Sequence, residues 1–406
     1  MEVSWRYMAV GVAMVGLVSS SALAQGAQAQ GKPVDTDVLA RKMVVDLAHI
    51  QEGENVIILG GVRDTQLLED IAVQVRKLGA FPLIVHRSER LSRRLFHDVP
   101  EKWDSQLPEF NLKLGTLIDA VFEVDFAENP DYLSDVPTER MGARWEANEL
   151  EDQVTRRRGV RSVALGNEMY PTAARARLYR VTQPQLEKLF WEGVNIDYSA
   201  LQARGAAFRK TLEAGKELRI THPNGTDLRI RVEGRPVFVS DGVIDEEDVK
   251  RGAPETFLPA GEVYLVPVKG TAEGTLVDDE MVMDIPGLHG EQNVIKGFKA
   301  TFKAGKIVSL DARSGLDTFK KVYWDVVGPG RDELSLINFG INPKVKFIPG
   351  SRLEVYQASG MVALGIGNQQ WAGSDNTASF GSRNYLPGCT VTLDGKVLIQ
   401  NGEPKL

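Results

Sequence analysis

The sequence predicts a protein of two lobes: an α/β N-terminal lobe with a doubly wound parallel sheet, and a mostly β (α+β) C-terminal lobe. Two short apolar runs, residues 56–59 and 82–85, enclose a helical pattern, and this β-α-β order is typical of a parallel sheet. From residue 217 the apolar positions alternate, which indicates strands with one buried face. The 406 residues suffice for two or three domains of about 150 residues each.

The N-terminal lobe is predicted to span residues 34–245. Its apolar runs are continuous rather than alternating, as in strands buried on both faces. Gly60 and Gly61 follow the first run; they lack the spacing of a dinucleotide-binding loop, and a plain strand-to-helix turn is the other interpretation. The predicted elements are a helix from Asp35, strands at 56–59, 82–85 and 119–124, and helices at 65–78 and 185–214.

The C-terminal lobe is predicted to span residues 246–406. Alternating segments at 218–221 and 228–232 flank Asn224-Gly225, a strong hairpin signal just before this boundary. Asp394-Gly395 marks a second hairpin near the C-terminus. The predicted elements of this lobe are strands at 262–268, 294–302, 306–311, 335–339, 352–356, 361–366 and 389–399, and a helix at 318–327.

The first residues are predicted to be a targeting segment. Arg6 precedes an apolar run at 8–18, and Ala22-Leu23-Ala24 offers a cleavage site, so residues 1–24 form a predicted signal peptide cleaved near Ala24. An uncleaved amphipathic helix is the alternative. Residues 25–33 are rich in Gly, Gln and Ala and are predicted to be a flexible tether. We therefore expect a periplasmic or secreted bacterial protein without stable membrane insertion after cleavage.

Composition narrows the class of protein further. Hydrophobic residues make up 43% and charged residues 25%, as in ordinary globular proteins. The net charge of -7 gives no sign of a nucleic-acid partner. Cys389 is the single cysteine, so an internal disulfide is excluded, and it is predicted to be a core residue. A basic cluster at residues 156–158 and Arg161 is either a solvated face or an anion site.

One carboxylate is placed by a turn. Pro259, Ala260 and Gly261 precede Glu262 at the start of an apolar strand, and turn residues of these types fix the backbone that carries the side chain. Carboxylates at strand ends are common metal ligands. The alternative is that Glu262 forms an ion pair or caps the backbone.

Several segments have the order and spacing of one known family. They include Leu-Pro-Ala-Gly-Glu-Val at 258–263, Thr-His-Pro-Asn-Gly-Thr-Asp-Leu at 221–228 and Gly-Ile-Asn-Pro at 340–343. With further segments at 51–56, 77–80, 170–172, 362–365 and 392–395, nearly the whole mature chain resembles the aminopeptidase T / aminopeptidase S family of metallopeptidases. The resemblance implies a homodimer that releases N-terminal residues from peptides with two zinc, cobalt or manganese ions, about 3.5–4 Å apart.

The ligand positions implied by this family are largely replaced. Glu262 matches the first glutamate. Counting along the motifs places Leu336 at the second glutamate, Met361 at the first histidine, and Gly381 and Arg383 at a His-x-Asp pair. Leucine, glycine and arginine cannot bind a cation, and a guanidinium would repel one.

Two interpretations of Arg383 stay open. It could occupy the vacated site, where it would pair with Glu262 or bind a substrate carboxylate, or it could lie on a displaced loop. Asn376, Tyr385 and Trp371 are possible pocket residues, or they serve packing. Replacement metal ligands could come from His289 with Glu291, or from Asp332, Glu333 and Asp375, although single acids are mostly solvated.

The sequence therefore supports two functions. One is an exported aminopeptidase that uses a divalent metal. The other is a non-catalytic derivative that needs no metal and binds a peptide or a small anionic ligand.

Overall fold

The computed structural model describes residues 34–283 and 293–405, which form two compact units. The N-terminal unit contains residues 34–175 and 242–258, and the C-terminal unit contains residues 176–241 and the chain from 259 onward. This division differs from the single boundary predicted after residue 245, because the chain returns to the first unit for one helix and one strand. The predicted signal peptide (1–24) and tether (25–33) lie outside the described residues.

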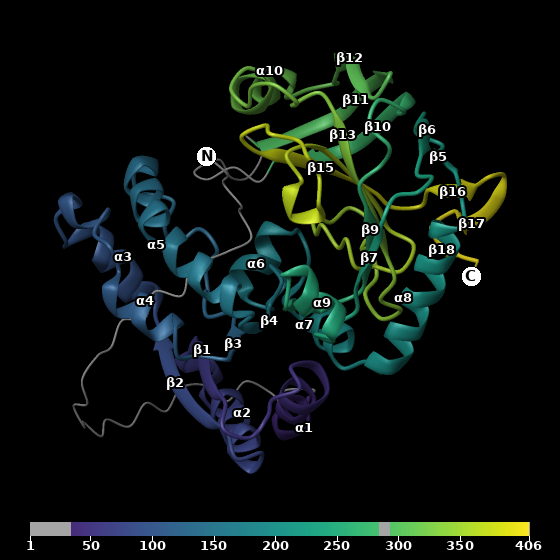
Figure 1. Cartoon of the computed structure of the whole chain (residues 1–406). Helices are drawn as coiled ribbons and strands as arrows, with labels where there is room; N and C mark the ends of the chain where they lie inside the picture. The colour runs from purple at the N-terminus through teal and green to yellow at the C-terminus, as the bar shows by residue number, and fades with distance from the viewer. Residues whose placement is uncertain (1–33, 284–292, 406) are drawn as a thin grey trace. The chain divides into compact units, whose positions relative to one another are not determined.

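The N-terminal unit is built on a five-stranded sheet in the order β2-β1-β3-β4-β8. Strands β1 to β4 are labelled in Figure 1. All four neighbouring pairs are parallel, which confirms the predicted parallel sheet. The order runs outward in both directions from β1 and β3, as expected of a doubly wound sheet. The strands are β1 (Asn55–Gly61), β2 (Phe81–Arg87), β3 (Ala120–Val124), β4 (Arg161–Leu165) and β8 (Glu255–Leu258).

Helices of this unit pack an apolar stripe on the sheet. Leu67, Leu68, Ile71 and Val75 of α2 are buried at helical spacing. Within the described residues, no helix combines the length and apolar character needed to cross a bilayer. The helical elements are α1 (Thr36–Arg41) with a π-helical turn (Lys42–Leu47), α2 (Thr65–Lys77), α3 (Glu89–His97), α4 (Glu109–Gly115), α5 (Thr138–Arg158), α9 (Glu246–Arg251) and two short 3-10 turns, Val62–Asp64 and Glu101–Trp103; α6 (Ala173–Leu178) leads out of the unit.

The C-terminal unit contains two antiparallel sheets, and this confirms its mostly β character. Sheet B has the order β12-β11-β10-β6-β5-β16-β17-β18. Its strands are β5 (Glu217–Thr221), β6 (Asp227–Arg231), β10 (Glu273–Val282), β11 (Val294–Lys303), β12 (Lys306–Asp311), β16 (Thr390–Leu393), β17 (Lys396–Gln400) and β18 (Glu403–Pro404). Both predicted hairpins lie in this sheet, between β5 and β6 and between β16 and β17.

Sheet C has the order β15-β14-β13-β9-β7. Its strands are β7 (Val237–Ser240), β9 (Glu262–Leu265), β13 (Leu334–Gly340), β14 (Val362–Gly367) and β15 (Gly381–Leu386). Helix α8 (Tyr198–Glu213) covers one face, where Phe208 lies 5.2 Å from Phe339 between ring centroids. The remaining helical elements are α7 (Gln183–Val194), α10 (Leu316–Phe319) followed by a π-helical segment (Lys320–Trp324), and a 3-10 turn (Gln370–Ala372).

The strand predicted at residues 352–356 is wrong. The segment is irregular, and its backbone folds back locally, because Val355 N donates to Leu353 O at 3.0 Å. Leu353 and Val355 are both buried, so the apolar alternation is real, but it serves a turn rather than a sheet. The helix predicted at 318–327 is shorter and changes to π geometry after Phe319.

Candidate functional site

The turn before β9 is held by Asn342. Its Nδ2 donates to the carbonyl oxygens of Ala260 at 2.7 Å and Gly193 at 3.0 Å, and Asn342 is fully buried. Gly261 has a φ of 129°, and a Cβ there would approach the Asn342 Cβ to 2.8 Å, so only glycine fits. The Pro-Ala-Gly turn and the asparagine of Gly-Ile-Asn-Pro therefore fix the point where Glu262 enters sheet C.

Glu262 begins β9, as predicted, and its side chain is only 3% exposed. It pairs with Ser240 of β7 and Gly340 of β13, and side chains of paired residues share a sheet face. The Glu262 carboxylate accepts a hydrogen bond from Nδ2 of Asn338, which pairs with Tyr264 on the same face. We call this side of sheet C, opposite to the side that α8 covers, the Glu262 face.

The other ligand positions predicted by the family resemblance lie on this face as well. On β13, Leu336 lies two residues before Asn338. Gly365 of β14 pairs with Leu336 on one side and with Arg383 of β15 on the other. Met361 precedes Gly365 by four residues. Because side chains alternate along a strand, even spacings keep them on one side. Gly381 adds no side chain, while Leu336 and Met361 are buried. The resemblance thus picked positions that the sheet brings to one face.

Arg383 is not paired with Glu262 in this structure. Its guanidinium carbon lies 5.1 Å from the Trp371 ring centroid, and Trp371 in turn lies 5.0 Å from Tyr264. Strands β13 and β14 separate β9 from β15. Along β15, Arg383 is four residues before the position that lies directly across the sheet from Glu262. Sheet spacings then place the two Cα atoms roughly 20 Å apart. The alternative of a displaced loop is also wrong, because Arg383 is part of β15.

The residues of the Glu262 face do not fit a pair of hard divalent cations. Such cations take carboxylate and imidazole ligands, and Glu262 is the one carboxylate among the five assigned positions. Across residues 34–283 and 293–405, no three histidine, cysteine, aspartate or glutamate side chains are grouped as a metal site.

The proposed replacement ligands have other partners. Glu333 lies 3.4 Å from Lys269 and 3.5 Å from Lys306, and Asp375 lies 3.4 Å from Lys269. Asp332 lies 4.0 Å from Lys306. The side chains of Lys269 and Lys306 therefore neutralise these three acids. His289 and Glu291 lie outside the described residues.

The predicted pocket residues have different roles. Trp371 lies over the Glu262 face, and its Nε1 donates to Oε1 of Gln369 at 2.8 Å. Tyr385 shares this face with Arg383, two residues before it on β15. Asn376 instead holds a loop, because its Nδ2 donates to Gly330 O at 2.9 Å and its Oδ1 accepts from Ala378 N at 2.9 Å. The sequence analysis missed Asn338, although even spacing from Leu336 on one strand could have indicated it.

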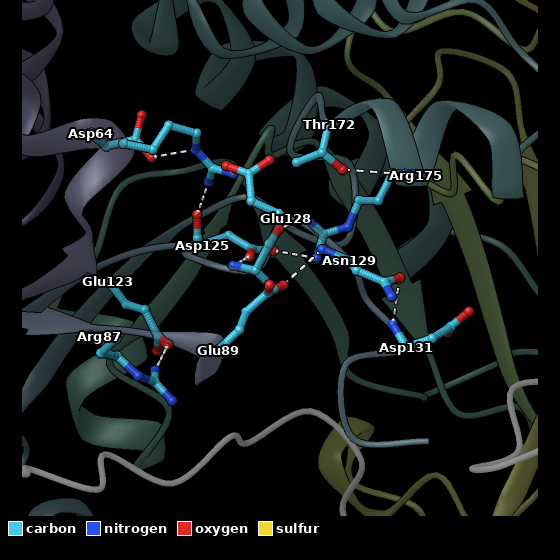
Figure 2. Close-up of polar contacts among 12 residues, drawn as sticks. Asp64, Arg87, Glu89, Glu123, Asp125, Glu128, Asn129, Asp131, Thr172 and Arg175 are labelled. Atoms are coloured by element: carbon cyan, nitrogen blue, oxygen red, sulfur yellow. Dashed lines mark hydrogen bonds and ion pairs between the residues drawn. The ribbon is translucent and has the colours of Figure 1, made fainter. Parts of the chain in front are cut away.

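A second polar cluster lies at the carboxyl ends of the strands in the N-terminal unit, where doubly wound sheets often bind ligands (Figure 2). Arg63 contacts Asp64 at 2.9 Å and Glu128 at 2.7 Å, while Arg175 contacts Asp125 at 2.7 Å. Burial raises the pKa of Tyr170, and the neighbouring Asp64 raises it further. Arg87 contacts Glu123 as well, so these three arginines are each neutralised by an acid of the same cluster.

Gly60 and Gly61 at the end of β1 are closely packed. A Cβ on Gly61 would lie 3.2 Å from the Phe126 Cβ, and a Cβ on Gly60 would lie 2.7 Å from Leu68. The glycine pair therefore serves close packing, which favours the interpretation as a plain turn. Two arginines of the basic cluster are paired with acids elsewhere in the unit, because Arg158 contacts Asp119 and Arg161 contacts Glu54.

Comparison with known proteins identifies the family. The family model of the thermophilic metalloproteases (M29) matches residues 35–325, which is more than half of the chain. The chain belongs to this metalloprotease family. Glu262 lies inside the matched segment, and Leu336, Met361, Gly381 and Arg383 follow it. No curated protein matches the sequence.

Solved structures of similar fold support the architecture of this metalloprotease family member. Wild-type AmpT from Thermus thermophilus has a TM-score of 0.68 at 17% identity, covering 91% of this chain and 99% of that one. A 2,5-dihydroxypyridine dioxygenase from Pseudomonas putida KT2440 has a TM-score of 0.57 at 15% identity, covering 92% and 98%. At these identities the likeness shows the fold alone.

Proposed function

We propose that this metalloprotease family member binds short peptides at the Glu262 face and does so without a dinuclear metal centre. The observation that carries the proposal is the residue set of that face. One assigned ligand position holds a carboxylate, and the other four hold leucine, methionine, glycine and arginine. Family membership supports peptides as the ligand class.

The two ends of the face suit the two ends of a peptide. Glu262 offers a carboxylate, Arg383 offers a guanidinium, and Tyr264 and Trp371 lie between them in ring contact. The separation of roughly 20 Å corresponds to about six residues of extended chain. A free peptide carboxylate would bind Arg383, because guanidinium groups pair well with carboxylates.

Elemental analysis of the purified mature protein, with binding of a hexapeptide measured by calorimetry, tests this proposal. We expect the metal content to stay far below one ion per chain after zinc, cobalt or manganese is added, and the hexapeptide to bind. R383Q should weaken binding of the free-acid hexapeptide about tenfold and leave the C-amidated form unchanged. Equal effects on both forms would contradict the assignment of Arg383.

The second candidate is a metal-dependent aminopeptidase, favoured by the family match and by the retained Glu262. Its signature is two metal ions per chain together with chelator-sensitive release of N-terminal residues. Finding both would overturn the metal-free proposal and direct attention to ligands outside the described residues.

Export belongs to the proposal as well. The apolar run before Ala24 supports a cleaved signal peptide and a periplasmic or secreted location. Sequencing the N-terminus of the protein recovered from periplasm and medium tests it, with Gln25 as the expected first residue. The homodimer implied by the resemblance stays a prediction that sedimentation can check.

A further inference from the structure

We propose that the N-terminal unit carries a peripheral membrane-binding surface whose partner is a bilayer of anionic phospholipid. The surface consists of the exposed side chains Phe81 and Leu83 of β2, Phe110 of α4, and Leu117 just after that helix. We call it the α4-β2 patch, and both elements are labelled in Figure 1. The inference goes beyond the proposed function and does not depend on peptide binding at the Glu262 face.

The first observation is the distribution of exposed apolar side chains. Among the described residues, every exposed tryptophan, phenylalanine and leucine belongs to the N-terminal unit. The large apolar side chains that the C-terminal unit exposes are three valines, Val308, Val326 and Val397. Most of the exposed rings and leucines lie within one stretch of the N-terminal unit: Phe81, Leu83, Trp103, Leu107, Phe110 and Leu117. Such a concentration of exposed apolar surface marks an interaction site.

The fold leaves one face of the edge strand β2 uncovered. Leu83 pairs with Ile57 of β1, so the two side chains share a face, but Ile57 is 2% exposed and Leu83 is 46% exposed. Leu114 of α4 packs against the core cluster that contains Ile57. The helix therefore covers β1 and stops short of β2.

The exposed side of α4 continues this open face. Phe110 lies one helical turn before Leu114, and Leu117 follows the helix. The carbonyl oxygen of Leu117 accepts a hydrogen bond from Nδ2 of Asn55 at 3.0 Å, and Asn55 pairs with Phe81 of β2. The four side chains of the α4-β2 patch therefore lie together at this edge of the sheet.

The second observation is the charge around the patch. Residues 76–117 contain eight lysines and arginines against five aspartates and glutamates, whereas the whole chain has a net charge of -7. The guanidinium carbon of Arg76 lies 5.2 Å from the ring centroid of Phe81, and Nζ of Lys102 lies 4.8 Å from that of Trp103. Cations beside exposed rings and leucines suit the boundary between anionic headgroups and acyl chains.

These features also decide against two other partners. A second copy would bring the same excess of positive charge to a symmetric contact, and like charges repel. A strand of another protein would need the open edge of β2. Phe81 N donates to Glu54 O at 2.7 Å, so the next residue, Pro82, directs its backbone toward that edge, where it offers no N–H. A bilayer needs no such donor.

Co-sedimentation of the full mature protein with lipid vesicles tests the inference. Vesicles of phosphatidylglycerol mixed with phosphatidylethanolamine are compared with vesicles of phosphatidylcholine, which carry no net charge. We expect binding to the anionic vesicles that weakens at high salt, because salt screens the attraction. The double variant F110S/L117S should weaken this binding about tenfold through lost apolar contact. K102E/K113E should weaken it about tenfold or more, since two attractive charges become repulsive.

Matched controls come from the C-terminal unit. V308S/V326S removes two exposed apolar side chains, and K320E/K321E reverses two exposed charges. Both should leave vesicle binding unchanged. Circular dichroism and the unfolding midpoint identify any variant that fails to fold. Quenching of tryptophan fluorescence by brominated phosphatidylglycerol is then the second measurement; it should occur in the wild type and decrease in W103F.

The outcomes distinguish this inference from the proposed function. Vesicle binding that both patch variants weaken and both controls keep supports the membrane surface, whether or not a peptide binds at the Glu262 face. Absence of binding to the anionic vesicles overturns it, and so does equal binding by patch and control variants. A dimer that F110S/L117S dissociates in sedimentation would assign the patch to a second copy and overturn the membrane surface as well.

Discussion

Glu151 is a buried acid whose charge opposes folding. It lies on α5 at 5% exposure, its Oε2 has no hydrogen-bond partner in the described chain, and burial raises its pKa to about 7. A folded-state pKa above the unfolded value of about 4.5 means that the folded form holds the proton more tightly. Stability should therefore fall as the pH rises from about 4.5 to 7 and then stay level.

E151Q removes this titration. We expect it to stabilise the protein by about 2 kcal/mol at pH 8 and by much less at pH 5, because glutamine stays neutral at both. Thermal unfolding at the two pH values measures the difference. E149Q, an exposed neighbour on the same helix, is the control and should change little. An equal effect of E151Q at both pH values would sink the argument.

Asn384 predicts a stabilising change at the residue scale. Its side chain is fully buried on β15, and neither Oδ1 nor Nδ2 has a partner in the described residues. Leucine has the same branching at Cγ and no polar atoms to desolvate, and the gain must exceed the cost of fitting its larger methyl groups. N384L should raise the free energy of unfolding by about 1 kcal/mol in urea titration. A loss of stability would instead mean that the amide has a water partner.

At the scale of elements, α8 packs on sheet C through a glycine. A Cβ on Gly205 would lie 2.5 Å from the Val239 Cγ1, closer than real Cβ atoms come. G205A should therefore destabilise the protein by about 1–3 kcal/mol, since overpacking outweighs the better helix propensity of alanine. Urea unfolding monitored by tryptophan fluorescence gives the change.

G142A is the matched control, because Gly142 lies inside α5 with nothing within 4 Å of the Cβ position. The same substitution there should stabilise by about 0.5–1 kcal/mol. The two variants therefore differ in sign although the chemical change is identical. Destabilisation by both would indicate that packing at Gly205 is not the cause.

Elements with a strong local signal could be predicted from the sequence. The hairpins at Asn224-Gly225 and Asp394-Gly395 and the buried strands β1 and β3 follow from turn chemistry and apolar runs. Residues 352–356 could not be predicted, because two buried apolar residues at alternating positions look alike in a strand and in a packed turn.

The candidate site likewise contains residues that the sequence could predict and residues that it could not. The place of Glu262 could be predicted from the turn before it, whereas Asn338 reaches Glu262 only through the register that pairs β13 with β9. The sequence left open whether Arg383 pairs with Glu262 for the same reason, because strand order decides that two intervening strands separate the two residues. Register is a tertiary property that local patterns do not contain.

On the scale of the whole molecule, the division into units depends on one late strand. β8 pairs in parallel with β4, from Ser162 with Glu255 to Leu165 with Leu258, although about 90 residues separate them in the chain. The intervening residues 176–241 belong to the other unit. A linear boundary was the natural prediction, since no local pattern shows where a short strand will pair.

This topology predicts that residues 34–175 do not form a stable fold by themselves. Without β8, strand β4 becomes an unpaired edge of the sheet. The hydrogen bond that Ile244 N donates to Leu47 O is lost as well. Urea titration followed by circular dichroism should show a broad, weakly cooperative transition for the 34–175 fragment.

The same fragment joined through a flexible Gly/Ser linker to residues 242–258 should unfold cooperatively, because the added segment restores the fifth strand. A linker followed by residues 242–253 alone, which carries α9 and lacks β8, separates the contribution of the strand from that of the helix. Equal cooperativity with and without residues 254–258 would show that β8 is an accessory to the sheet rather than a part that its stability requires.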